Sequence, residues 1–208
     1  MYRNLVEALT CGLPEHNYEK YYSLKNGDVF VEGGAFFGRY ANIASKKVGV
    51  KGKIIAIEPS PLNTPILRGN TDKLGNVTVI EKALWSSEGL ARFWINPDSE
   101  KVRWSAHKLA VLKSHGFGEH VEVKVDTLDN ILTSFEIEKV DLLAWDVEGS
   151  GMEALKGTKN FLESNKILNL ALCFYHRSLY ESVEEASKII EGYGYKILEK
   201  EGIVYATL

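Results

Sequence analysis

The sequence predicts an α/β protein with a doubly wound, mostly parallel seven-stranded sheet that ends in an antiparallel hairpin. Short apolar segments with little polar alternation, as expected of strands buried on both faces, alternate with segments of helical periodicity. The chain then closes over residues 195–208 with two strand-like segments around a Lys-Glu-Gly turn. Such a tight hairpin requires one antiparallel strand at or near an edge of the sheet.

Each expected element follows from its local pattern. The expected strands cover residues 28–33, 53–58, 76–85, 140–149, 167–176 and two segments within 195–208. The expected helices cover residues 38–49, 60–75, 126–135, 151–164 and 178–194. Ser60 is the expected N-cap of the second helix, although Pro65 favours a later start or a kink. In the less regular part, we expect an edge strand at 89–95, a short helix at 105–116 and a strand at 121–125.

Composition limits the function classes. The chain has 208 residues, of which 45% are hydrophobic and 25% charged, with a net charge of −3. A nucleic-acid partner is not expected, because phosphate binding usually needs a basic excess. Two cysteines, Cys11 and Cys173, do not indicate a disulfide framework. The first residues contain no continuous apolar stretch, so we expect no signal peptide, no membrane span and a cytoplasmic protein.

The domain organisation is expected to be simple. Residues 1–26 read as a short helical extension, interrupted where Gly12 and Pro14 break the periodicity. Residues 27–208 form one domain in this interpretation, and the sequence does not indicate an oligomeric state.

A glycine-rich segment follows the first expected strand. Gly33, Gly34 and Gly38 come directly after Glu32, a density that favours a ligand-binding loop over a plain turn. The spacing does not match the G-x-G-x-x-G pattern of dinucleotide loops, and an acid at this place would repel a diphosphate. A ligand with an ammonium and a sulfonium, such as S-adenosylmethionine, suits it better. Glu58, which ends the second strand, could accept ribose hydroxyls of either NAD or S-adenosylmethionine.

The chain resembles the FkbM-type methyltransferase family from about Gly27 to about Arg177. The resemblance rests on "VFVEGGAFFG", "GKIIAIEPSP", "NVTVIEKALWSSEG", and "VDTLDNIL" followed by "VDLLAWDVEGSGMEALKG". It implies a Rossmann-like methyltransferase fold, S-adenosylmethionine as cofactor and a hydroxyl oxygen as methyl acceptor. The cofactor contacts that it implies are Glu32, Gly33, Gly34, Ala35, Gly38, Glu58, Pro59, Ser60, Ala83 and Leu84.

The chain departs from the family pattern at several positions. The usual Asp and Asn of the first loop are Glu32 and Phe36, and the Lys and aliphatic residue before the fourth-strand acid are Ala144 and Trp145. A Glu two residues before His176 is replaced by Phe174. We expect one ring of the Phe36–Phe37 pair to pack against the sheet and the other to wall the methyl-transfer pocket.

The catalytic candidates end two strands. Asp146 ends the fourth strand and could be a base, a positioning group or a purely structural residue, while His176 ends the fifth and could accept a hydroxyl proton. Glu148 could share the face of Asp146 if the strand continues, as a substrate contact, a metal ligand or a helix-terminal charge. No third ligand stands out nearby, so no metal site is predicted. The remaining substrate candidates are Trp104, His107 and Tyr175.

Three functions stay open on these grounds. The leading one is an S-adenosylmethionine-dependent O-methyltransferase acting on a small molecule, a sugar or a polyketide-like acceptor. The second is a cofactor-binding module without catalysis, which the departures at Phe36, Ala144 and Phe174 motivate. The third is an NAD-dependent oxidoreductase, which Glu58 permits and the glycine spacing disfavours.

Overall fold

A seven-stranded sheet forms the centre of the molecule. The computed structural model describes residues 17–95, 108–109, 119–174, 182–199 and 202–208. The strand order is β10-β11-β9-β8-β1-β2-β3, and only β11 runs antiparallel to its neighbours. The predicted fold class is therefore confirmed, including the C-terminal hairpin. The strands are β1 Val29–Gly33, β2 Lys53–Ile57, β3 Val77–Ile80, β8 Leu142–Trp145, β9 Asn169–Cys173, β10 Lys196–Glu199 and β11 Ile203–Thr207.

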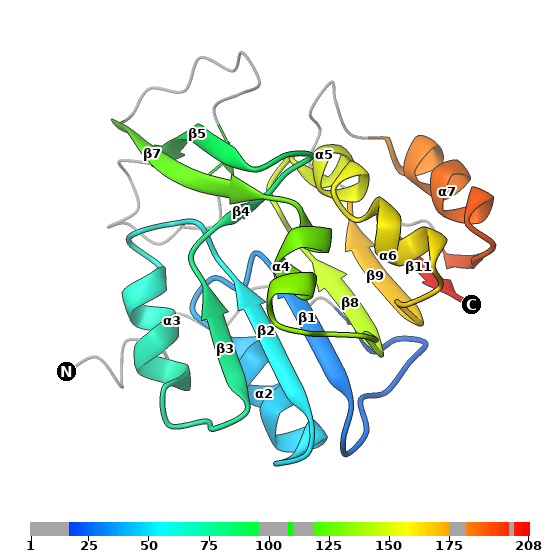
Figure 1. Ribbon diagram of the computed structural model, residues 1–208, viewed down its shortest axis with the longest axis horizontal. Helices are drawn as coiled ribbons and strands as arrows, with labels where there is room; N and C mark the ends of the chain where they lie inside the picture. Colours follow the sequence, from blue (N-terminus) through cyan, green and yellow to red (C-terminus); the bar gives the residue numbers. More distant parts are fainter. Residues whose placement is uncertain (1–16, 96–107, 110–118, 175–181, 200–201) are drawn as a thin grey trace.

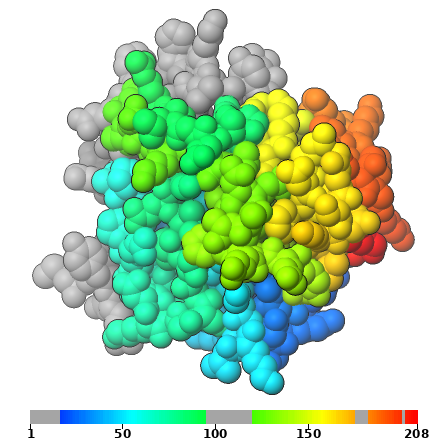
Figure 2. Space-filling view, viewed as in Figure 1, coloured from blue at the N-terminus to red at the C-terminus, as the bar shows by residue number. Residues whose placement is uncertain are grey.

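Helices cover both faces of this sheet. They are α2 Arg39–Val48, α3 Thr64–Thr71, α4 Leu128–Ser134, α5 Gly151–Lys156, α6 Lys159–Glu163 and α7 Val183–Gly192. Apolar side chains of α2 and α3 pack on one face, and those of α4 to α7 pack on the other. Figure 1 shows α4 in front of the sheet and α2 behind it, and Figure 2 shows α4 to α6 covering the front.

The central strands are apolar because both of their faces are buried. Every residue of β8 is buried, and so is every residue of β1, β2 and β9 after the first. Alternate residues of one strand serve opposite cores: Phe30 packs with α2, whereas Val31 packs on the α4 side. This is why these strands show no polar alternation in the sequence.

The segment before β1 packs against the α2 side of the sheet. Tyr18 and Leu24 are buried there, although residues 17–26 form turns and contain no helix. Glu19 fixes the segment, because its carboxylate accepts hydrogen bonds from the Leu24 N–H, the Tyr40 hydroxyl and Lys47. Residues 1–16, the rest of the expected helical extension, lie outside the described residues.

A second, smaller sheet lies beyond the carboxyl end of β3. Its order is β4-β7-β5-β6, with bounds β4 Ala83–Leu84, β5 Gly89–Ile95, β6 Lys108–Leu109 and β7 Glu119–Asp126. Figure 1 shows β5 and β7 above the main sheet. The single strand expected at 76–85 was wrong, because the chain crosses from one sheet to the other at Glu81 and Lys82. Lys82 is anchored there by a 2.6 Å ion pair with Asp126.

Three helix predictions need correction. The expected helix at 105–116 is wrong at residues 108–109, which pair with β5 as a strand; the rest lies outside the described residues. The second helix begins at Thr64, with Asn63 rather than Ser60 at the N-cap position, although Ser60 Oγ accepts the Asn63 N–H at 3.4 Å. Pro65 stands in the first turn, where its missing N–H costs nothing. The helix at 151–164 is two helices, since the Asp129 carboxylate accepts the Asn160 and Phe161 N–H groups and so starts α6 separately.

Among the residues that the structure describes, no helix combines the length and the apolar character that crossing a membrane would require.

Candidate functional site

The candidate site lies at the carboxyl ends of β1, β2 and β8. The chain leaves β1 toward β2 and β3 on one side and returns to β8 on the other side of β1. In doubly wound sheets, the ligand crevice lies at this reversal of strand order. The loop after β1, residues 33–38, occupies the reversal, and we call it the glycine loop. It is held between both neighbours, because the Gly34 N–H donates to Ile57 O and the Asp146 N–H donates to Gly33 O.

The glycines of this loop are required by the protein's own packing. Gly34 has φ of 76°, and a Cβ at this position would lie 2.0 Å from the carbonyl oxygen of Asp146. Gly38, with φ of 77°, precedes α2, and a Cβ there would lie 2.5 Å from Leu67. Close approach to β8 and α3 therefore explains both positions, and it places the loop backbone at the edge where a ligand would bind.

Four amide groups of the glycine loop are already used within the protein. The Gly34 and Ala35 N–H groups both donate to Ile57 O, at 2.8 and 3.0 Å. The Gly38 N–H donates to Ala35 O, and the Phe36 N–H donates to a carboxylate. A loop that binds a diphosphate needs such N–H groups to point at the ligand. This arrangement therefore disfavours a dinucleotide at this place.

Glu58 connects the glycine loop to the loop after β2. Its Oε2 accepts the Phe36 N–H at 2.9 Å, and its Oε1 accepts the Ser60 N–H at 3.0 Å and the Asn63 side-chain amide at 3.1 Å. The carboxyl group is 5% exposed. Burial raises its pKa to about 7, although these donors act in the opposite direction. Asn63 was not identified from the sequence as a partner of Glu58. Its position directly before Thr64-Pro65, at the start of a helix, was the signal that could have indicated it.

Glu32 is the second buried carboxyl group of the site. It lies in β1, where Gly33 is paired in register with Ile57, the residue before Glu58. It accepts a hydrogen bond from the Ala41 N–H in the first turn of α2, while its Oε2 has no hydrogen-bond partner within the described chain. Burial raises the pKa of Glu32 to about 8, and the nearby Glu58 also raises it. Two acidic groups thus lie buried at neighbouring strand ends.

The two phenylalanines of the glycine loop differ in burial. Phe37 is buried and Phe36 is half-buried, with their rings stacked 3.8 Å apart at an angle of 19°. Phe36 has φ of 52°, a left-handed conformation that a bulky side chain rarely adopts. This difference is compatible with the expectation that one ring packs against the sheet and the other walls the methyl-transfer pocket. Phe36 is the ring nearer to solvent.

The other predicted cofactor contacts lie around the same edge. Ser60 is fully buried, and Pro59 is half-buried. Ala83 and Leu84 are both buried in β4, and Leu84 approaches β1 so closely that a Cβ on Gly33 would lie 2.8 Å from it. The structure therefore brings the predicted cofactor contacts together at one end of the sheet.

Asp146 and Glu148 lie in the turn after β8. The strand ends at Trp145, so the condition under which Glu148 would share the face of Asp146 is not met. Glu148 has φ of 48° and Gly149 has φ of 91°, which turns the chain sharply before α5. Both acids are half-buried. The described residues contain no cluster of metal-binding side chains. Trp104, His107, Tyr175 and His176 lie outside the described residues.

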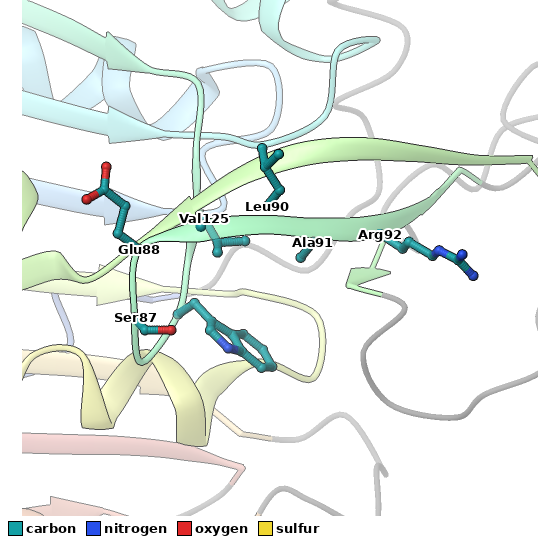
Figure 3. A pocket seen from close by; sticks show the side chains of 8 residues that line it. Ser87, Glu88, Leu90, Ala91, Arg92 and Val125 are labelled. Carbon is teal, nitrogen blue, oxygen red and sulfur yellow. The ribbon is translucent and has the colours of Figure 1, made fainter.

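A cleft of about 350 Å³ lies against β5, on the second sheet. Its apolar residues are Trp85, Leu90, Ala91 and Val125, and its polar side chains are Ser87, Glu88 and Arg92. Figure 3 shows Ser87 and Glu88 at one end of the row of side chains and Arg92 at the other end. The sequence did not point to this cleft, because the strand break at Glu81 and Lys82 was not recognised.

Comparison with known proteins gives consistent results. The model of the methyltransferase FkbM domain family matches residues 32–197. Hexuronic acid methyltransferase AglP of Haloferax volcanii is 31% identical over 138 residues, which cover 66% of this chain and 52% of that protein. A crystal structure of methyltransferase FkbM from Methylobacillus flagellatus superposes with a TM-score of 0.61 at 17% identity, covering 91% of this chain and 46% of that one.

A more distant structure shares the fold. Fibrillarin of Aeropyrum pernix, solved with natively bound S-adenosylmethionine, gives a TM-score of 0.51 at 16% identity and covers 98% of this chain and 74% of that one. At such identities the likeness concerns the fold alone. The chain spans about half the length of AglP and of the Methylobacillus protein.

Proposed function

The chain belongs to the methyltransferase FkbM domain family, and on that premise we propose that it transfers a methyl group from S-adenosylmethionine to a hydroxyl oxygen of a small molecule. One observation carries the proposal beyond the family. Two buried acids, Glu32 and Glu58, stand at neighbouring strand ends beside a loop whose amide groups are already engaged. That site suits a cationic nucleoside ligand and not a diphosphate.

The residues present fit this cofactor. A carboxylate offers about four acceptor positions. Three protein donors occupy three of these positions on Glu58, two on Oε1 and one on Oε2, so Oε2 can still accept a ribose hydroxyl. The unpartnered Oε2 of Glu32 would face the cationic amino-acid end. When bound, S-adenosylmethionine supplies a methyl group on a positively charged sulfur.

The protein's part in the reaction is to orient the acceptor and to take its proton. Methyl transfer is an in-line displacement, so alignment supplies a large share of the rate. Asp146 follows β8 beside the glycine loop, and its carboxylate is the described group that would orient or deprotonate the hydroxyl. The strand expected to end at His176 ends at Cys173 instead, and His176, three residues further on and outside the described residues, remains the second candidate for the base.

We further propose that the acceptor is a sugar with an acidic substituent. The name of AglP, a hexuronic acid methyltransferase, supports this class. The cleft on the second sheet offers compatible chemistry, because indole rings pack on sugar rings and guanidinium groups bind carboxylates in bidentate fashion. Trp85 and Arg92 are the two residues concerned.

Turnover tests the proposal. The protein is assayed for methyl transfer from S-adenosylmethionine to hexuronic acids, neutral hexoses and phenolic alcohols. We expect methylated hexuronate and a loss of about 10²–10⁴-fold in Asp146→Asn if Asp146 is the base. Binding of S-adenosylhomocysteine without turnover on any acceptor would favour a cofactor-binding module, and binding of NAD alone would favour an oxidoreductase.

A further inference from the structure

The side chain of Glu32 is buried with one oxygen unsatisfied. The residue is 4% exposed, and its Oε2 has no hydrogen-bond partner in the described parts of the chain. Among the described residues, the Ala41 N–H of α2 is the donor that acts on the carboxyl group. By contrast, the equally buried Glu58 receives three donors. The two acids of the site therefore differ in how well their negative charge is stabilised.

In the described part of the chain, two other acids follow the strands on either side of Glu32. Glu58 follows β2 on one side, and Asp146 follows β8 on the other, two residues beyond Ala144, the register partner of Glu32. Tyr40 of α2 interacts electrostatically with Glu32, but its hydroxyl donates its hydrogen bond to Glu19. Arg39, at the start of α2, is exposed to solvent.

An ionised carboxylate in such a place is costly. Burial without a partner raises the pKa of an acid, so that the neutral form is favoured, and a neighbouring acid raises the pKa further. A cation that binds beside Oε2 reverses both effects, because it provides the missing donor and the opposite charge. The protonation state of Glu32 must then depend on whether a cationic ligand is bound.

We propose that Glu32 holds a proton in the ligand-free protein and releases it when the ammonium group of the cofactor binds beside Oε2, so that cofactor binding is coupled to proton release. The O–H bond of the carboxyl group breaks, its electron pair stays on the oxygen, and the proton passes to solvent. The inference rests on the proposed function, from which it takes its ligand. Below neutral pH, protons and cofactor then compete for the same group.

Calorimetry measures the coupling directly. S-adenosylhomocysteine is titrated into the protein at pH 7 in phosphate and in Tris, whose ionisation enthalpies differ, and the difference in observed heat gives the protons released. 5′-Deoxy-5′-methylthioadenosine, which keeps the nucleoside and lacks the ammonium, is the matched ligand. We expect S-adenosylhomocysteine to release up to about one proton more than the matched ligand.

Two variants assign the proton. Glu32→Gln keeps the shape and neutrality of the protonated acid, and it should abolish the ammonium-dependent release. Glu58→Gln should retain that release. In the unmodified protein, the affinity for S-adenosylhomocysteine should rise by up to about tenfold per pH unit from pH 6 toward pH 8, a slope that Glu32→Gln should make clearly shallower.

The outcomes separate this inference from the function. Tight binding with equal proton release for both ligands, or with release retained in Glu32→Gln, overturns the coupling and leaves the methyltransferase proposal standing. If the affinity of the unmodified protein for S-adenosylhomocysteine does not change with pH, the coupling is also overturned. This measurement does not require any variant to fold. If S-adenosylhomocysteine does not bind at any pH, both proposals fail.

Discussion

The Phe36 N–H donates a 2.9 Å hydrogen bond to Oε2 of Glu58, so one buried carboxylate joins the loop after β1 to the loop after β2. Its other oxygen holds Ser60 and Asn63 at the start of the α3 segment. Glu58 thus has a structural role as well as the ligand-binding role proposed for it.

Glu58→Ala should lower the free energy of unfolding by roughly 1–3 kcal/mol, because buried donors lose their acceptor. Urea denaturation of the ligand-free protein measures the effect. Glu81→Ala is the control: Glu81 is exposed and forms an ion pair with exposed Arg68, so its removal should cost about 0–1 kcal/mol. Equal effects in the two variants would mean that the carboxylate does not hold the loops together.

Gly34→Ala should destabilise the protein strongly. An added Cβ would lie 2.0 Å from the backbone oxygen of Asp146, and φ of 76° is unfavourable for alanine. Strain and overpacking together predict a loss of about 2–5 kcal/mol. Gly69→Ala is the matched control, because nothing lies within 4 Å of a Cβ there. In the helix α3 it should gain roughly 0.5–1 kcal/mol. Thermal unfolding of the two variants should move in opposite directions.

Glu32→Gln should change the pH dependence of stability. The pKa of Glu32 is raised to about 8 in the folded protein, so between about pH 4.5 and 8 the folded state binds more protons than the unfolded state. Stability therefore falls as pH rises through this window, by up to about 1.4 kcal/mol per unit. Glu32→Gln cannot ionise, so its unfolding free energy should fall less steeply. Parallel curves for the two proteins would show that Glu32 ionises normally.

Glu148→Gly tests whether backbone strain after β8 serves function. Glu148 and Glu136 both have left-handed backbones, with φ of 48° and 53°. Glycine adopts the left-handed conformation without this strain, so each Glu→Gly variant should gain up to about 1 kcal/mol of stability. Only Glu148→Gly should lower methyl transfer, because Glu136 lies at the far end of α4. A Glu148→Gly enzyme with full turnover would remove Glu148 from the candidate site.

The sequence predicts the main sheet well because its signals are local. Apolar strands such as β8 and the C-terminal hairpin around Gly202 each have a signal within a few residues of the sequence. The glycine loop and Glu58 also follow from local pattern, and the family resemblance adds Pro59, Ser60, Ala83 and Leu84 as expected cofactor contacts. The second sheet was only partly foreseen, because β4 is two residues long and pairs with β7, far along the chain. The unsatisfied oxygen of Glu32 depends on three-dimensional contacts that no local pattern encodes.

The most direct test of the account is a calorimetric titration at pH 8 of S-adenosylhomocysteine and NAD into the wild-type protein and into Glu58→Ala. The account predicts that S-adenosylhomocysteine binds the wild-type protein and that Glu58→Ala weakens this binding by roughly 1.5–3 kcal/mol, since a charge-assisted hydrogen bond to ribose is lost. It also predicts no heat of binding for NAD. Binding of NAD in preference to S-adenosylhomocysteine, or an affinity unchanged in Glu58→Ala, would contradict it.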